Sequence, residues 1–214
     1  GSGKTHRLDV RARQPFALRR RRPRHMRGDG TDLHQEQLTQ YFTHVWPKTQ
    51  KMLDVARQQQ PKEDYEWRVN WTRPERLSTQ IDKDARVLDV GCGEQPMKQY
   101  LNNVYGIDIT DIGADEVVAI EDFKSDERFD VAVCLGSINF GNVQKVFSEL
   151  QKCVDITEPG GLLFFRVNPG IQHDPVEAKW IEFFEWTPEF IFNSAKEVGC
   201  SVVNMRNDAN RIYF

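Results

Sequence analysis

The chain has 214 residues, of which 39% are hydrophobic and 29% are charged, so it is long enough for one domain with a substantial core. Its formal net charge of −3 is unevenly spread, because residues 1–28 hold ten Lys/Arg and one acid, whereas the rest holds 19 bases and 31 acids. An acidic body is a poor partner for a phosphate backbone, which argues against a main domain that binds nucleic acid. No apolar run approaches the roughly 20 residues that cross a bilayer.

Residues 1–28 form a basic arm that opens with GSGKT, a sequence similar to the end of a phosphate-binding loop. Such a loop needs a preceding strand and an earlier glycine, and the sequence offers neither, so phosphate binding is not predicted here. The arm could bind nucleic acid or an acidic membrane surface if it is native. His25-Met26 resembles a cloning junction, which favours a vector-derived arm outside the fold.

Residues 29–83 are predicted to form an N-terminal helical segment. Apolar residues recur at helical spacing from Leu33 to Val45, and a second helix is predicted over 48–59. The next stretch either closes as a lid over a ligand or packs against a sheet, through Trp67, Arg68 and Trp71.

From residue 84 onward, strand and helix patterns alternate. Strands are predicted at RVLDV, NVYGIDI, EVVAI, FDVAVCL, GLLFFRV, CSVVNMR and RIYF. Helices are predicted at GEQPMKQYLNN, 142–156, 176–186 and 188–198, and a PGG turn should precede the fifth strand. This alternation predicts an α/β fold, a doubly wound seven-stranded sheet that is mostly parallel. Such sheets bind ligands at the carboxyl ends of their strands, where the strand order reverses.

The cysteines carry little functional signal. Four of them are scattered without a Cys-x-x-Cys pair: Cys92, Cys134, Cys153 and Cys200. Their spacing does not suit a zinc site, so no metal is predicted. Their mostly apolar surroundings predict reduced, buried thiols and a cytoplasmic protein.

The first strand of the sheet runs directly into Gly91-Cys92-Gly93. Glycines at these positions let backbone approach a ligand closely, although a tight turn without a ligand would use them too. Asp108 ends the next strand, where a carboxylate can accept both hydroxyls of a ribose. A dinucleotide site would need a third glycine at Pro96, so the sequence predicts a nucleoside ligand without phosphates.

RVLDVGCGEQP with YGIDI resembles the nucleoside-binding half of class I S-adenosylmethionine-dependent methyltransferases. VVAIEDF, FDVAVCLGSINF and EPGGLLFFRV are similar to the third, fourth and fifth strand motifs of that family, in the same order. GCGEQPMKQYL resembles a subset with a shortened first helix, and the whole resemblance covers residues 84–214. The sequence departs from the pattern at Gln95, where many members carry a third glycine.

The resemblance implies S-adenosylmethionine as cofactor and S-adenosylhomocysteine as its product. By motif position, the backbone of Gly91 and Gly93 would pass against the amino-acid part of the cofactor, with Cys92 between them. Asp89 would hold the cofactor ammonium, and Asp108 would accept the ribose hydroxyls. Cys92 also reads as a small packing residue rather than a nucleophile.

The resemblance also implies residues around the adenine and the sulfonium. Ile109 would press on the adenine, and Asp122 would accept a hydrogen bond from its amino group, with Phe123 beside it. Asp122 could instead be a solvated loop acid, as could Glu121, and Phe123 could belong to the core. The cleft near the sulfonium would be lined by Leu135, Gly136 and Ser137.

The methyl acceptor leaves less trace, because methyl transfer mainly requires correct positioning. GSINFG stands where DNA amino methyltransferases carry Asn/Asp-Pro-Pro-aromatic, and no Pro-Cys pair of a cytosine C5 enzyme occurs there. We therefore predict an enzyme that acts on a small molecule rather than on nucleic acid. The candidate general bases are His173, Asp174 and Glu177, which follow the fifth strand. His173 has the titration range that best suits this role, although it could be merely a polar loop residue. The alternative is a non-catalytic accessory protein that keeps the fold and binds a partner.

Overall fold

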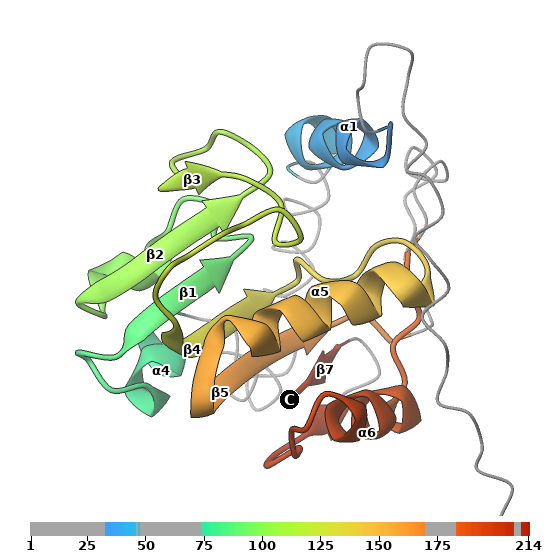
Figure 1. Cartoon of the computed structure of the whole chain (residues 1–214). Helices are drawn as coiled ribbons and strands as arrows, with labels where there is room; N and C mark the ends of the chain where they lie inside the picture. The colour runs from blue at the N-terminus through green and yellow to red at the C-terminus, as the bar shows by residue number, and fades with distance from the viewer. Residues whose placement is uncertain (1–32, 46, 48–73, 170–182, 208–210) are drawn as a thin grey trace, which may run out of the picture. The chain divides into compact units, whose positions relative to one another are not determined.

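The computed structural model describes residues 33–45, 47, 74–169, 183–207 and 211–214 (Figure 1). The chain divides into two compact units, residues 1–36 and 37–214, and the second holds all the strands described below. Within the described ranges, no helix combines the length and apolar character that a bilayer crossing requires.

The described strands form one seven-stranded sheet with the order β3-β2-β1-β4-β5-β7-β6. The strands are β1 (Arg86–Val90), β2 (Asn103–Asp108), β3 (Glu116–Val117), β4 (Phe129–Leu135), β5 (Thr157–Val167), β6 (Arg206–Asn207) and β7 (Ile212–Tyr213). Neighbours from β3 to β5 run parallel, whereas β7 is antiparallel to β5 and β6. The predicted mostly parallel sheet is confirmed, and the strand order reverses between β1 and β4, next to the glycine turn.

The sheet is covered on both faces because successive strand residues point to opposite sides. Helices α5 (Val143–Asp155) and α6 (Pro188–Glu197) cover one face, and α5 crosses β4 and β5 in Figure 1. Their core cluster includes Leu88, Val90, Cys134, Val146, Leu150 and Ile191. The opposite cluster lies under α4 (Pro74–Leu77) and η3 (Pro96–Gln99), and it includes Leu77, Val87, Met97, Val131 and Val133.

Side-chain caps fix the starts of the two long helices. Asn142 Oδ1 accepts a hydrogen bond from Lys145 N at 3.1 Å at the start of α5. Thr187 Oγ1 accepts one from Phe190 N at 3.1 Å, immediately before Pro188 opens α6. Each bond satisfies a backbone N–H that has no partner inside the helix, and both predicted helix starts are confirmed.

The helical pattern near the N-terminus is confirmed as α1 (Leu33–Gln40) followed by the π-helical turn η1 (Tyr41–Val45). A 3₁₀ turn, η2 (Ser78–Gln80), extends α4. The helix predicted over 48–59 and the candidate lid at 67–71 lie outside the described residues.

Several predicted elements differ from the structure. The strand predicted at CSVVNMR is wrong except at its last residue, because β6 begins at Arg206 and continues to Asn207, outside the predicted stretch. The PGG sequence lies inside β5 instead of before it, opposite an irregular register between Phe129 and Val131. The end of the helix predicted over 176–186 is also wrong. Residues 183–186 run extended there, because the buried Trp186 inserts its ring and donates from Nε1 to Ile138 O at 2.9 Å.

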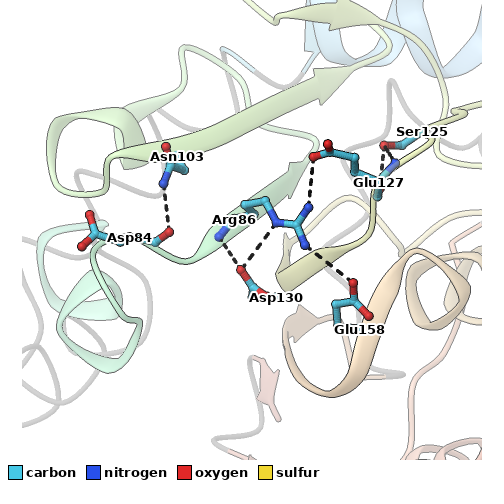
Figure 2. A network of polar contacts seen from close by, with 7 residues as sticks. All are labelled: Asp84, Arg86, Asn103, Ser125, Glu127, Asp130 and Glu158. Carbon is cyan, nitrogen blue, oxygen red and sulfur yellow. Dashed lines mark hydrogen bonds and ion pairs between the residues drawn. The ribbon is translucent and has the colours of Figure 1, made fainter.

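The amino ends of β1, β4 and β5 meet at an ion-pair network around Arg86 (Figure 2). Its guanidinium lies 3.0 Å from Glu127, 3.8 Å from Asp130 and 3.6 Å from Glu158. Asp130 Oδ2 also accepts a hydrogen bond from Arg86 N at 2.8 Å. These side chains are 40–79% exposed, so water weakens the ion pairs and each contributes little to stability.

Candidate functional site

The glycine turn after β1 is held by the end of β2 and packed against the end of β4. Gly91 N and Cys92 N donate to Ile107 O at 2.8 and 3.1 Å. Gly91 has φ +73°, and a Cβ placed on it would lie 2.6 Å from Ser137 Cβ. Gly93 has φ +54°, and a Cβ there would meet no atom of the described residues within 4 Å. The first glycine therefore permits close packing, and the second borders open space.

Asp108 reaches this open space from the end of β2. Its Oδ2 accepts a hydrogen bond from Gly93 N at 3.0 Å, which brings the carboxylate directly to the turn. Its Oδ1 accepts from Thr110 N at 2.9 Å and from Thr110 Oγ1 at 2.8 Å. Carboxylate oxygens accept more than one hydrogen bond each, so capacity remains for a ligand hydroxyl. Sequence reasoning missed Thr110, although a hydroxyl residue two positions after an acid is a known turn signal.

Asp89 is a buried carboxylate in β1, only 6% exposed. Burial, and then the nearby charge of Asp108, raise the pKa of Asp89 to about 7. Among the described residues none donates a hydrogen bond to this carboxylate, and Ser137 Oγ is likewise enclosed without a partner there. Unpaired buried polar groups are costly, and a ligand ammonium would relieve the cost at Asp89. The carboxylates of Asp89 and Asp108 therefore suit a nucleoside that carries an amino-acid group.

Cys92 lies inside the turn with 5% of its surface exposed. Burial, followed by the charges of Asp89 and Asp108, raises the pKa of its thiol to about 12. A thiol with such a pKa stays protonated at neutral pH and is a poor nucleophile. The structure thus agrees with a packing residue.

Gln95 shows how this chain accommodates its departure from the family pattern. It adopts the left-handed conformation that the third glycine would favour, with φ +55°, and it is 8% exposed. Its Nε2 donates to Gly113 O in the loop after β2, while Oε1 has no partner among the described residues. A Cβ on Gly106 would lie 2.5 Å from Gln95 Oε1 and 2.8 Å from Cys92 Sγ. Gly106 therefore makes room for a side chain that joins the two loops of the site.

Two predicted adenine neighbours lie in apolar clusters. Ile109 packs against a cluster formed by Leu38, Tyr41 and Phe140, so the N-terminal helical segment reaches the residue next to Asp108. Phe123 is 2% exposed and lies in the core cluster on the α5 side. The structure thus places Phe123 in the core, which is the alternative for this residue, and Ile109 immediately after β2.

The loop after β3 is tied to α5 by charge. Asp122 N donates to Ala119 O at 3.0 Å in a tight turn. The neighbouring Glu121 pairs with Lys145 Nζ at 3.4 Å, and the same ammonium contacts Glu149. Burial raises the pKa of Glu149 to about 7, although the Lys145 charge opposes the rise. Because Glu121 pairs with Lys145, it is held in place and is not a purely solvated loop acid.

The three residues predicted near the sulfonium follow one another where β4 ends. Gly136 has φ +107°, and Ser137 abuts Gly91, so this end of β4 adjoins the glycine turn. Leu135 O accepts a hydrogen bond from Arg166 Nη2 at 2.5 Å. The candidate base His173 lies outside the described residues, and so do its neighbours Asp174 and Glu177. Within the described part of the chain, no three His, Cys, Asp or Glu side chains gather as metal ligands would.

A family model described as a methyltransferase domain matches residues 47–194. A search of curated proteins finds no significant match.

Three solved structures illustrate the fold. Magnesium protoporphyrin IX methyltransferase (ChlM) from Synechocystis PCC 6803, with bound SAH, is 15% identical, with 82% of this chain and 96% of that chain covered and a TM-score of 0.54. An S-adenosylmethionine-dependent methyltransferase from Clostridium acetobutylicum ATCC 824 is 12% identical, with coverage of 79% and 97% and a TM-score of 0.54. The sugar N-methyltransferase KedS8 from Streptoalloteichus sp ATCC 53650 is 13% identical, with coverage of 72% and 92% and a TM-score of 0.50.

Proposed function

The chain belongs to the class I S-adenosylmethionine-dependent methyltransferases, and we propose that its methyl acceptor is a small molecule. The acidic balance of residues 29–214 disfavours nucleic acid, as does the absence of nucleic-acid methyltransferase motifs from GSINFG. Proteins of similar fold include enzymes named for a porphyrin and for a sugar. We propose that this chain, too, methylates a small molecule.

One observation carries the cofactor assignment: the Asp108 carboxylate meets Gly93 N at 3.0 Å, at the edge of the open space beside Gly93. In this assignment Asp108 accepts the ribose hydroxyls, and the buried Asp89 pairs with the ammonium of the amino-acid part. The Gly91–Gly93 backbone lies against that part. Ile109 and Asp122 border the adenine.

The protein itself has three tasks in the reaction. S-adenosylmethionine, when bound, supplies a methyl group already activated on a sulfonium, so the protein needs no nucleophile of its own. The side chains around the turn orient the reactants and exclude water, which makes an in-line transfer efficient. A base is needed only where the acceptor loses a proton, and His173 remains the predicted candidate.

Binding of S-adenosylhomocysteine tests the cofactor assignment. A ligand at about one hundred times its Kd stabilises a protein by about 2.7 kcal/mol, which for a chain of this size raises Tm by about 5–11 °C. Asp108→Asn should reduce this shift, whereas the exposed Asp126→Asn should leave it unchanged. Absence of any shift at saturating ligand would refute the assignment.

Transfer of a labelled methyl group tests the acceptor class. The protein is incubated with methyl-labelled S-adenosylmethionine and, separately, with a small-metabolite extract, RNA, DNA and mixed protein. We expect label only in the small-molecule fraction. Label confined to a macromolecular fraction would contradict the proposed acceptor and leave the methyltransferase assignment intact.

A further inference from the structure

Asn139 is a buried polar residue that the cofactor assignment does not use. It follows the end of β4 and is 1% exposed. Its Oδ1 accepts a hydrogen bond from Asn168 N at 2.8 Å, just after β5. Its backbone oxygen accepts one from Phe184 N at 2.8 Å, in the segment before α6. Asn139 therefore joins three segments at the carboxyl edge of the sheet.

These contacts determine which end of the amide remains available. A backbone N–H can only donate, so the atom that faces Asn168 N must be the amide oxygen. The other end is then Nδ2, which carries two N–H donors. No hydrogen bond from Nδ2 to a described residue is found, and Nδ2 is not among the fully enclosed polar atoms that lack a partner. Nδ2 therefore keeps donors that are available to a ligand atom with lone pairs.

A second donor lies near the same backbone position, Gly136. A Cβ placed on Gly136 would lie 3.2 Å from Arg166 Nη2 and 4.0 Å from Asn139 Nδ2. Arg166 also donates to Leu135 O at 2.5 Å and has further interactions. A guanidinium has five N–H donors and a permanent charge, so it can hold several partners at once.

We propose that Asn139 Nδ2 and Arg166 recognise an oxyanion, a carboxylate or a phosphate, on the methyl acceptor. The inference rests on the proposed function. Both groups are donors, so they cannot satisfy the hydrogens of an amine, whereas an oxyanion supplies acceptors and balances the guanidinium charge. The position suits the methyl acceptor, because Gly136 adjoins Ser137, and Ser137 packs on Gly91 of the glycine turn.

Asn139→Asp is the first variant, and it acts on the proposed contact in two ways: it removes the NH₂ donor, and its negative charge repels an oxyanion. It keeps an oxygen for Asn168 N and replaces the NH₂ donor by a second oxygen of the same size, so the structural role of the side chain is preserved. Retention of the fold is checked by Tm and by the Kd for S-adenosylhomocysteine, which should stay within about twofold. Arg166→Gln serves as a second variant, which removes the charge.

The binding probes are benzoate, inorganic phosphate and the neutral control benzamide. Each is titrated into protein labelled with ¹⁵N-asparagine, and the side-chain resonance of Asn139, assigned by its loss in Asn139→Asp, is followed. Benzoate or phosphate should shift this resonance saturably, and benzamide should not. Isothermal titration should show at least about tenfold weaker oxyanion binding by both variants, because a charge-assisted hydrogen bond or the charge itself is lost.

Three outcomes would overturn the inference: no saturable shift with either oxyanion, an equal shift with benzamide, or unchanged oxyanion binding by Asn139→Asp. Whichever oxyanion binds better tells a carboxylate acceptor from a phosphorylated one. The titrations are run both with and without S-adenosylhomocysteine. If S-adenosylhomocysteine does not bind, the proposed function fails, and the titrations without it still decide whether the oxyanion site exists.

Discussion

Replacing Asp89 with asparagine should stabilise the ligand-free protein at neutral pH and weaken its binding of S-adenosylhomocysteine. The carboxylate is buried, and no described residue donates to it. Its ionised form is therefore costly until a cation binds. Asparagine has nearly the same shape and no charge, so the substitution removes both the cost and the attraction for an ammonium group.

The size of the effect follows from the pKa of Asp89, which rises from 3.8 to about 7 on folding. This rise corresponds to an upper limit of about 4 kcal/mol of destabilisation when the group is ionised. Because the folded pKa is the higher one, the penalty is absent below about pH 4, grows as pH rises toward 7 and is complete above it. At about 2–4 °C per kcal/mol, the variant should melt several degrees above wild type at pH 8 and level with it at pH 4.

Thermal melts of wild type, Asp89→Asn and the exposed control Asp126→Asn, recorded from pH 4 to 8, measure the first effect. Titration with S-adenosylhomocysteine at pH 8 measures the second, and loss of a charge-assisted contact should weaken binding by about tenfold or more. Equal affinity of wild type and Asp89→Asn would refute the role assigned to this carboxylate. A difference in Tm between wild type and Asp89→Asn that does not grow with pH would refute the raised pKa of Asp89.

Three further changes probe the framework around the site. Gly106→Ala should destabilise the fold by about 1–3 kcal/mol in urea unfolding, because its methyl group would overlap Gln95; a variant as stable as wild type would contradict that packing. Thr110→Val should raise the Kd for S-adenosylhomocysteine several-fold with Tm nearly unchanged, because the Asp108 carboxylate loses an orienting hydroxyl, and an unchanged Kd would count against this role. Arg86→Met should lower the free energy of unfolding by less than about 1 kcal/mol in dilute buffer, and by less still in 1 M salt, when both are measured by urea unfolding. A decrease that does not depend on salt would show that the network is not electrostatic.

The fold was largely predictable where local pattern and burial agree. The sequence FDVAVCL is apolar except for Asp130, as expected of a strand covered on both faces, and it matches β4 residue for residue. Asn142 predicts the start of α5 because its side chain caps the helix. CSVVNMR has the apolar residues of a strand, yet only its last residue, Arg206, finds a partner in the sheet. Pairing depends on tertiary context that a local pattern does not contain.

The candidate site was predictable in outline, because strand ends and glycines mark it in the sequence. The contact between Asp108 and Gly93 follows from two parallel neighbours that end at the same edge. The contact between Gln95 and Gly113 could not be predicted, because it joins two loops and depends on an empty Cα position at Gly106. Asn139 was missed as well, since one polar residue in an apolar run does not show which end of its amide is occupied.

The placement of β7 between β5 and β6 imposes an order of assembly. β6 precedes β7 in the chain, but among the described strands it pairs with β7 alone, so it has no place in the sheet until β7 has docked. Detachment of β7 would release both strands together as one cooperative unit of local opening. It would also leave β5 with an unpaired edge, which is a template for adhesion to another chain. The last strand described here thus protects the sheet against aggregation.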